Sequence, residues 1–107
     1  MSTKAEKQWM SDIADLGCVV CRNEGFGKSP AEVHHLKAGC GMSQRSKDMD
    51  SIPLCPRHHR AGMGDYGEAF HAGPRVWQEK FGTELELLAQ TIEDVKAYRA
   101  SIIGRAA

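Results

Sequence analysis

Two short cysteine and histidine patterns constrain this chain more than any other feature. The first is Cys18-Val-Val-Cys21 and the second is Cys55-Pro-Arg-His58-His59. Thiolate sulfur and imidazole nitrogen are the usual ligands of structural zinc, and the two-residue spacing lets both members of a pair reach one tetrahedral ion. A closed set of four ligands leaves no open position, so we predict a structural zinc site formed by Cys18, Cys21, Cys55 and His58. In a chain of 107 residues, whose core is small, such an ion adds folding free energy.

The Cys-x-x-Cys pair also has a redox interpretation. A thioredoxin-like pair lies at the N-terminus of a helix that follows a strand. Here a predicted helix precedes the pair and the turn Asn23-Glu24-Gly25 follows it, so the context favours metal binding. Two ordinary buried cysteines are a further alternative. The fourth cysteine, Cys40, is an alternative ligand, although a buried or idle thiol is the simpler expectation.

Histidines remain once the four ligands are assigned. His34 and His35 are adjacent in a predicted strand, residues 31–36, so their side chains point to opposite faces. His58 and His59 lie about 100° apart on a predicted helix, so they can serve different ions. His34 and His59 then form an incomplete ligand set that is open to water or phosphate, as a catalytic ion requires. His35, which is not needed as a ligand, is a candidate general base.

The other patterns predict a small α+β fold with two short strands and flanking helices. Apolar residues fall on one stripe of Lys4–Leu16, and Gly17 ends that helix. A second strand, Ser51–Leu54, leads into a helix with Pro56 in its first turn. A helix over Pro74–Phe81 comes next.

The last predicted helix begins at a capping box, residues 83–86. Its apolar stripe predicts a packing helix with four core-facing residues: Leu85, Leu88, Ile92 and Val95. We find no repeat and no linker, so we expect one domain over 1–107. Its parts are an N-terminal helix (1–16), a metal-binding core (17–71) and C-terminal helices (74–103).

Composition limits the class of partner and the location. The chain has 14 basic and 14 acidic residues and no formal net charge, which argues against a strongly basic nucleic-acid wrapper but leaves room for a local basic patch. Residues 37–51 predict a loop with a cationic face or, alternatively, a merely solvated loop. No apolar run is long enough to span a membrane, and the first residues have no apolar signal core. We therefore expect a cytoplasmic protein with reduced cysteines.

The His-His pair, the loop and the sequence Ile-Pro-Leu-Cys-x-x-His-His resemble the HNH endonuclease motif on a ββα-metal fold. The resemblance implies that His34 and His59 bind the catalytic metal and that His35 is the general base. Asp50 takes the place of the middle asparagine, which steadies the loop and the base in that family. Asp48 is the competing candidate for that role.

A narrower match covers residues 17–90. The metal patterns, together with Ala-Phe-His71 and the later Phe-Gly and Leu-Leu-Ala, resemble the recombination-enhancement (Ref) nucleases of temperate bacteriophages. Those proteins are RecA-dependent HNH nucleases with two zinc sites. The resemblance implies DNA as substrate, a RecA filament as a partner in the bacterial host cell, and Mg²⁺ or Zn²⁺ at the catalytic site. It also implies that His71 is a further ligand or active-site residue.

The predicted function is therefore metal-dependent hydrolysis of DNA phosphodiester bonds. Four basic residues could hold flanking phosphates without reading sequence: Lys37, Arg45, Lys47 and Arg60. Solvated surface charge is the alternative for each of them. Because the net charge is zero and the long basic arm of the phage proteins is lacking, we expect weak binding to bare DNA. A RecA filament, or another phage or host protein, would then present the substrate. The competing class is a non-catalytic zinc module that binds nucleic acid or protein, and the surplus histidines argue against it.

Overall fold

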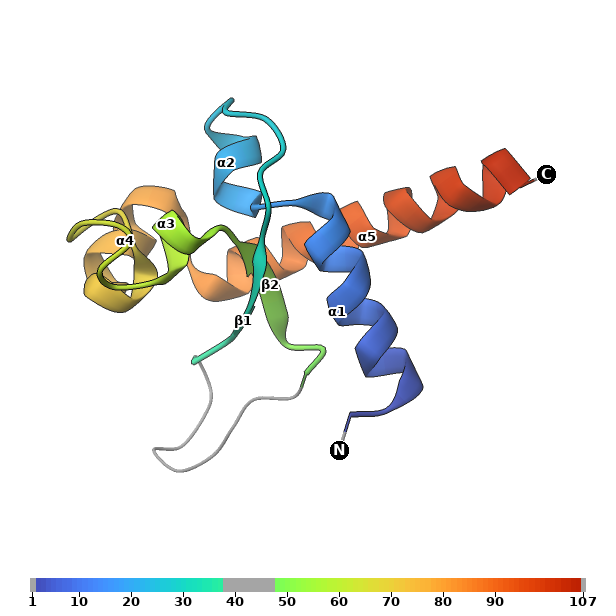
Figure 1. Cartoon of the computed structure of the whole chain (residues 1–107), viewed down its shortest axis with the longest axis horizontal. Coiled ribbons are helices and arrows are strands. Elements are labelled where there is room, and N and C mark those ends of the chain that lie inside the picture. The colour runs from blue at the N-terminus through green and yellow to red at the C-terminus, as the bar shows by residue number, and fades with distance from the viewer. Residues whose placement is uncertain (1, 38–47, 107) are drawn as a thin grey trace.

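A short antiparallel hairpin lies at the centre of the computed structural model, which describes residues 2–37 and 48–106, with side chains up to residue 103. Its strands are β1 (Glu32–His35) and β2 (Ser51–Leu54) (Figure 1). All four residues of β2 are buried, because helices pack against this strand. Only one strand of the pair is therefore open enough to present a side chain to solvent.

Helix α3 (Pro56–His59) follows β2 after a single residue and completes a ββα unit with the hairpin. Pro56 occupies the first turn, where its missing N–H costs no hydrogen bond. The helix is only four residues long, and its C-cap is Arg60 in extended conformation. The predicted α+β class, with two short strands and flanking helices, is confirmed.

Helix α1 (Lys4–Leu16) has the bounds that the sequence predicts. Thr3 caps it through a reciprocal capping box with Glu6, and Gly17 ends it at φ 83°, a conformation that favours glycine. The indole Nε1 of Trp9 donates to Ser51 Oγ at 3.0 Å, which ties the helix to the first residue of β2.

A five-residue helix, α2 (Val19–Asn23), begins directly after Cys18. The sequence predicts only a metal-binding Cys-x-x-Cys pair followed by a turn in this place. Cys18 is its N-cap, and the N–H of Cys21 donates to the Cys18 sulfur at 3.4 Å. The cysteine pair therefore lies at a helix N-terminus, but the element before it is a helix and not the strand of a redox motif.

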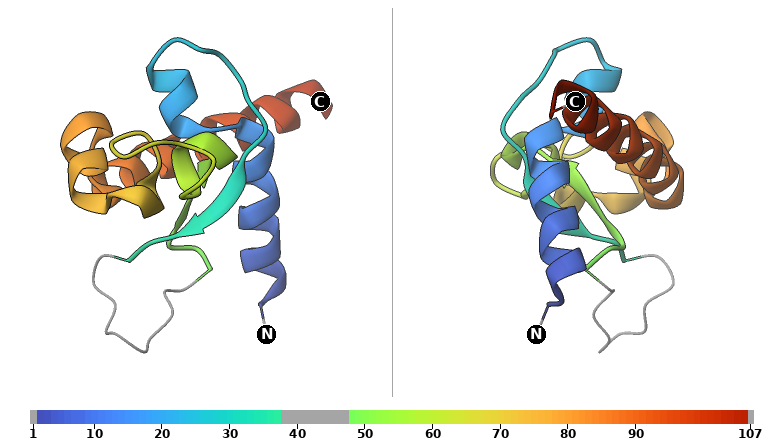
Figure 2. Two further views of the ribbon diagram at one scale, coloured as in Figure 1. Left: turned by 60° about the vertical axis from the view of Figure 1, so that its left-hand side comes forward. Right: turned by 90° about the vertical axis from the view of Figure 1, so that its right-hand side faces the viewer.

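The C-terminal part of the chain contains η1 (Phe70–Ala72), α4 (Pro74–Phe81) and the long α5 (Glu84–Ala106). Helix α5 passes behind the hairpin, and its last turns extend beyond α1 (Figures 1 and 2). The predicted bounds of α4 and the capping box that opens α5 are both confirmed. In that box the backbone N–H of Thr83 donates to the Glu86 carboxylate at 3.1 Å, and the backbone N–H of Glu86 donates to the Thr83 hydroxyl at 3.1 Å.

The predicted core face of α5 is partly wrong. Leu85 and Ile92 are exposed, at 61% and 38%, whereas Val95 is buried as predicted. The buried face of the helix also carries Glu84 and Thr91. Thr91 is tolerated there because its hydroxyl donates to the Leu87 carbonyl at 2.7 Å. Leu88, also predicted, is half-buried and packs against both groups of core residues, so the predicted stripe is offset from the buried face rather than opposite to it.

Two groups of buried side chains hold these elements together. The smaller group joins α1 to α5 and contains Trp9, Ile13 and Val95. The larger group surrounds the hairpin and contains the three cysteines of the metal patterns, together with the apolar residues Val19, Val20, Leu36, Ile52, Leu54, Phe70, Trp77 and Leu87. In the described part of the chain, no helix is long and apolar enough to cross a membrane.

Candidate metal centres

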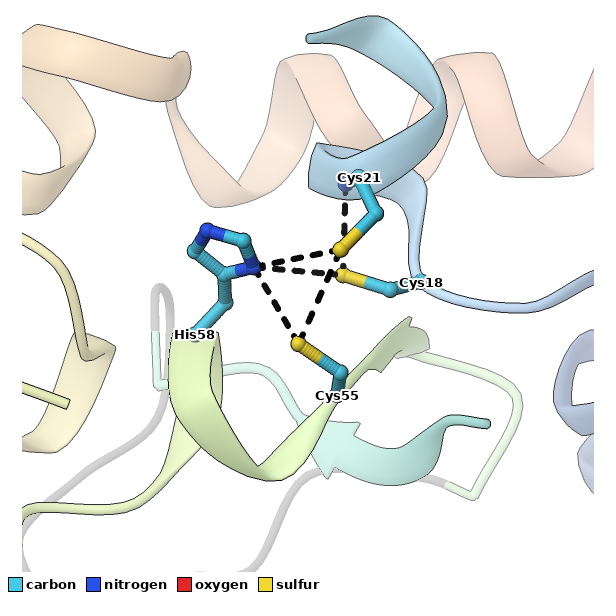
Figure 3. A group of neighbouring side chains, drawn as sticks. All are labelled: Cys18, Cys21, Cys55 and His58. Atoms are coloured by element: carbon cyan, nitrogen blue, oxygen red, sulfur yellow. Dashed lines mark hydrogen bonds between the residues drawn. The ribbon is translucent and has the colours of Figure 1, made fainter. Parts of the chain in front are cut away.

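The first candidate centre is a buried group of three thiols and one imidazole: Cys18, Cys21, Cys55 and His58 (Figure 3). His58 Nδ1 lies 3.7 Å from the sulfur of Cys18, 3.5 Å from that of Cys21 and 3.2 Å from that of Cys55. The sulfurs of Cys21 and Cys55 are 3.8 Å apart. Ligands about 2.3 Å from a tetrahedral zinc ion would be separated by about 3.8 Å for two sulfurs. The four donor atoms therefore fit a metal ion of this kind in size, chemistry and number.

Short local elements bring these four donors together. Cys18 and Cys21 lie on the first turn of α2, and Cys55 and His58 on the first turn of α3. Burial raises the pKa of the Cys18 thiol to about 12 and lowers the pKa of His58. Metal binding at this centre must therefore displace the thiol proton of Cys18, whereas the histidine offers its lone pair at neutral pH.

The second candidate centre is a group of three histidines on three different elements. His34 of β1, His59 of α3 and His71 of η1 offer ligand nitrogens that all lie within 4.8 Å of one another. The ring centroids are 5.1 Å apart for His34 and His59 and 4.9 Å apart for His59 and His71. Three protein ligands leave room for a water or a substrate oxygen, unlike the closed four-ligand group.

Burial favours the neutral, metal-binding form of two of the three rings. Burial lowers the pKa of His34 and of His71, so both rings are neutral at neutral pH. Phe70 packs against the His34 ring with centroids 4.4 Å apart and closes one side of the group. His71, by contrast, is exposed, so the group opens to solvent on the side of η1.

Two carboxylates hold the rings of this group. Nε2 of His34 lies 2.7 Å from Glu84 Oε2, and Nδ1 of His59 lies 3.0 Å from Glu32 Oε1. Burial would raise the pKa of Glu32, but hydrogen bonds from Arg60 and His59 outweigh it and lower that pKa. Because an ionised carboxylate only accepts hydrogen bonds, Glu32 is the acceptor in its contact with His59, which favours the proton on Nδ1 and the lone pair on Nε2 of that ring.

A comparison with protein families agrees with this arrangement. The family model described as recombination enhancement, RecA-dependent nuclease matches residues 2–96, which is most of the chain. The chain belongs to this family. Membership of the RecA-dependent nuclease family makes it a nuclease, an enzyme that acts on nucleic acid, and confirms the resemblance to the Ref nucleases. No curated protein sequence matches the chain.

His35, the candidate general base in this RecA-dependent nuclease, does not belong to the three-histidine group. It follows His34 in β1, and its Nε2 lies 2.8 Å from Asp48 Oδ1. The hydroxyl of Ser2 also donates to the Asp48 carboxylate. His35 therefore contacts the carboxylate of Asp48, the competing candidate for the orienting role. Asp50, the first candidate, accepts the Leu36 N–H through its backbone carbonyl at 2.9 Å.

The candidate phosphate-binding residues are only partly described. Arg45, Lys47 and the fourth cysteine, Cys40, lie outside the described residues. Lys37 is exposed at the end of β1, and its backbone N–H donates to Glu84 Oε2 at 2.9 Å. Arg60 is exposed but forms an ion pair with Glu32. Its guanidinium is thus held beside the second centre.

Two site residues could not be recognised from the sequence, namely Glu84 and Glu32. Glu84 is the first residue of α5 and lies inside the capping-box pattern, which accounts for an acidic residue there without any contact to a distant strand. Glu32 alternates with His34 along β1 and carries no motif of its own. The one sequence signal for Glu32 is that it is an acidic residue in the strand that carries His34, and Glu84 has no such signal.

Proposed function

We propose that this protein is an HNH endonuclease that hydrolyses DNA phosphodiester bonds with a divalent metal ion at the three-histidine group. The observation that carries the proposal is the presence of two different donor sets, one closed and buried, the other of three imidazoles and open to solvent. Membership of a family of recombination nucleases supports the same conclusion. The closed set would hold a structural Zn²⁺ ion, and the open set a catalytic Mg²⁺ or Zn²⁺ ion.

In this proposal each histidine has a separate task. His34, His59 and His71 would hold the catalytic ion, each through one ring nitrogen. When bound, such an ion supplies Lewis acidity, which offsets charge on the scissile phosphate and on the leaving 3′ oxygen. Nε2 of His35 lies 2.8 Å from Asp48 Oδ1 and would donate its proton to that carboxylate, which leaves Nδ1 as the atom that removes a proton from the attacking water. Asp48 would hold this ring in the required tautomer and orientation.

The distribution of charge around the site favours substrate delivered by a partner. Two arginines near the centres are already paired, Arg57 with Glu68 at 3.0 Å and Arg60 with Glu32. The whole chain has no formal net charge, so release of counterions from DNA can add little affinity. We therefore propose that a RecA filament on DNA is the partner and that the protein acts inside the bacterial cell.

Cleavage of a labelled DNA duplex, with and without RecA-coated single strand, tests this proposal. We expect binding to bare duplex in the range of non-specific binding at physiological salt, a Kd of about 10⁻⁴–10⁻⁶ M. We expect metal-dependent cleavage to appear mainly when RecA filament is present. RecA filament alone and RecA without its nucleotide cofactor are the controls.

Two results would count against the partner requirement. A sub-micromolar Kd for bare duplex would show that the protein binds its substrate unaided. Equal cleavage rates with and without the filament would show that RecA does not present the substrate. Binding of DNA without cleavage under any of these conditions would favour a non-catalytic zinc module.

A further inference from the structure

A buried acidic residue, Glu84, connects three parts of the fold at the second metal centre. It is the first residue of α5, and its side chain is only 3% exposed. One carboxylate oxygen, Oε2, lies 2.7 Å from His34 Nε2 and accepts from the Lys37 backbone N–H at 2.9 Å. The backbone N–H of Glu84 itself donates to the Gln78 side chain at 3.1 Å, so the start of α5 is held as well.

A carboxylate buried to this extent needs a specific reason, because removing an acidic group from water is costly unless it is paired and hydrogen-bonded. A described partner of its carboxylate is the buried imidazole of His34, at 2.7 Å. Capping of α5 does not require it, since Thr83 and Glu86 form the capping box. The contact with His34 therefore accounts for the burial of this side chain better than local helix stability does.

We propose that Glu84 is a positioning residue for the second metal centre, where it selects Nδ1 of His34 as the metal-binding atom. The carboxylate accepts the Nε2 proton, fixes the plane of the ring and increases the electron density on Nδ1. Glu32 would act on His59 in the same way, but there the carboxylate contacts Nδ1, so Nε2 is the nitrogen left for the metal. This inference rests on the proposed role of the three histidines as a metal site, but not on cleavage of DNA.

Metal titration of two matched variants tests the role of Glu84. The probe is Co²⁺, added to protein whose four-ligand group holds zinc, with binding followed by calorimetry and by the visible absorption of Co²⁺. The Glu84→Gln side chain keeps its size and one carbonyl oxygen for both hydrogen bonds but loses the charge. We expect its affinity for Co²⁺ at the three-histidine group to fall about tenfold or more. Glu86→Gln, two residues further along the same helix turn, should bind Co²⁺ as tightly as the wild type.

Structural and positioning roles give different results in this experiment. An unchanged Co²⁺ affinity in Glu84→Gln, whatever its melting temperature, would overturn the proposal, and so would a wild-type protein that binds no Co²⁺ at the three histidines. Loss of affinity in a variant that melts like the wild type supports it. That result would stand even if the wild type proved unable to cleave DNA, so the two proposals can fail separately.

A measurement on the wild type remains decisive if Glu84→Gln does not fold. Nitrogen-15 spectra of the imidazole rings, recorded on the zinc-containing protein before Co²⁺ is added, report which ring nitrogen carries the proton. We expect the Nε2–H tautomer for His34 and the Nδ1–H tautomer for His59. The Nδ1–H tautomer at His34 would contradict the proposal, because the nitrogen assigned to the metal would then carry a proton.

Discussion

Substitution of His35 by alanine is expected to lower the rate of DNA cleavage by about 10²–10⁴-fold, the usual contribution of a general base. The variant should keep the fold and both metal sites, because His35 lies outside the two donor groups that can hold an ion. Alanine offers no atom that could remove a proton from water. Single-turnover cleavage of DNA presented by RecA, together with metal analysis and melting of the same preparation, measures both parts of this expectation.

The outcome also decides between candidate residues. Cleavage by His35→Ala at the wild-type rate would move the base elsewhere, and His71, the exposed member of the three-histidine group, would be the next candidate. Asp48→Asn and Asp50→Asn form a matched pair for the orienting role. Because the described contact of His35 is with Asp48, we expect the larger loss of rate in Asp48→Asn.

Substitution of Cys18 by serine is expected to release the structural ion and to destabilise the whole fold. Cys18 is fully buried between α2 and α3, and its sulfur is one of the four donors of the closed group. Losing such a site should cost several kcal/mol, which for a domain of this size lowers the melting temperature by roughly 10 °C or more. Zinc content and thermal melting of the purified variant give the answer.

Cys40→Ser is the matched control for this experiment, since our assignment gives Cys40 no ligand role. It should retain zinc and melt like the wild type. A Cys18→Ser protein with unchanged zinc content and unchanged melting temperature would show that the four-ligand assignment is incorrect. Loss of zinc in Cys40→Ser instead would make Cys40 a ligand.

Elements with strong local signals could be predicted from the sequence. Helix α1 begins at a capping residue and ends at Gly17, and β2 leads directly into α3 through Pro56. The closed metal group was also predictable, because two Cys and His pairs at this spacing are typical of structural zinc sites. Each of these signals lies within a few residues of the element that it specifies.

Features that depend on contacts between distant segments were harder to predict. Glu84, for example, is buried at the start of α5 and contacts His34 of the distant strand β1, a partner that no local pattern around Glu84 indicates. The partner of His35 was ambiguous for a similar reason. Asp48 and Asp50 are both near in sequence, and the resemblance to the HNH motif pointed to Asp50. In the folded chain the residue that contacts the His35 ring through its carboxylate is Asp48.

The most direct test of the proposed function is removal and return of the second metal ion. Protein that retains its structural zinc but has been depleted of any second ion is mixed with RecA-presented DNA, and cleavage is followed before and after Mg²⁺ or Zn²⁺ is added back. We predict no cleavage without the added ion and full, saturable recovery with it, and no recovery over the same range in His34→Ala. Cleavage at the same rate before the ion is returned would contradict the assignment of the three histidines as the catalytic metal site.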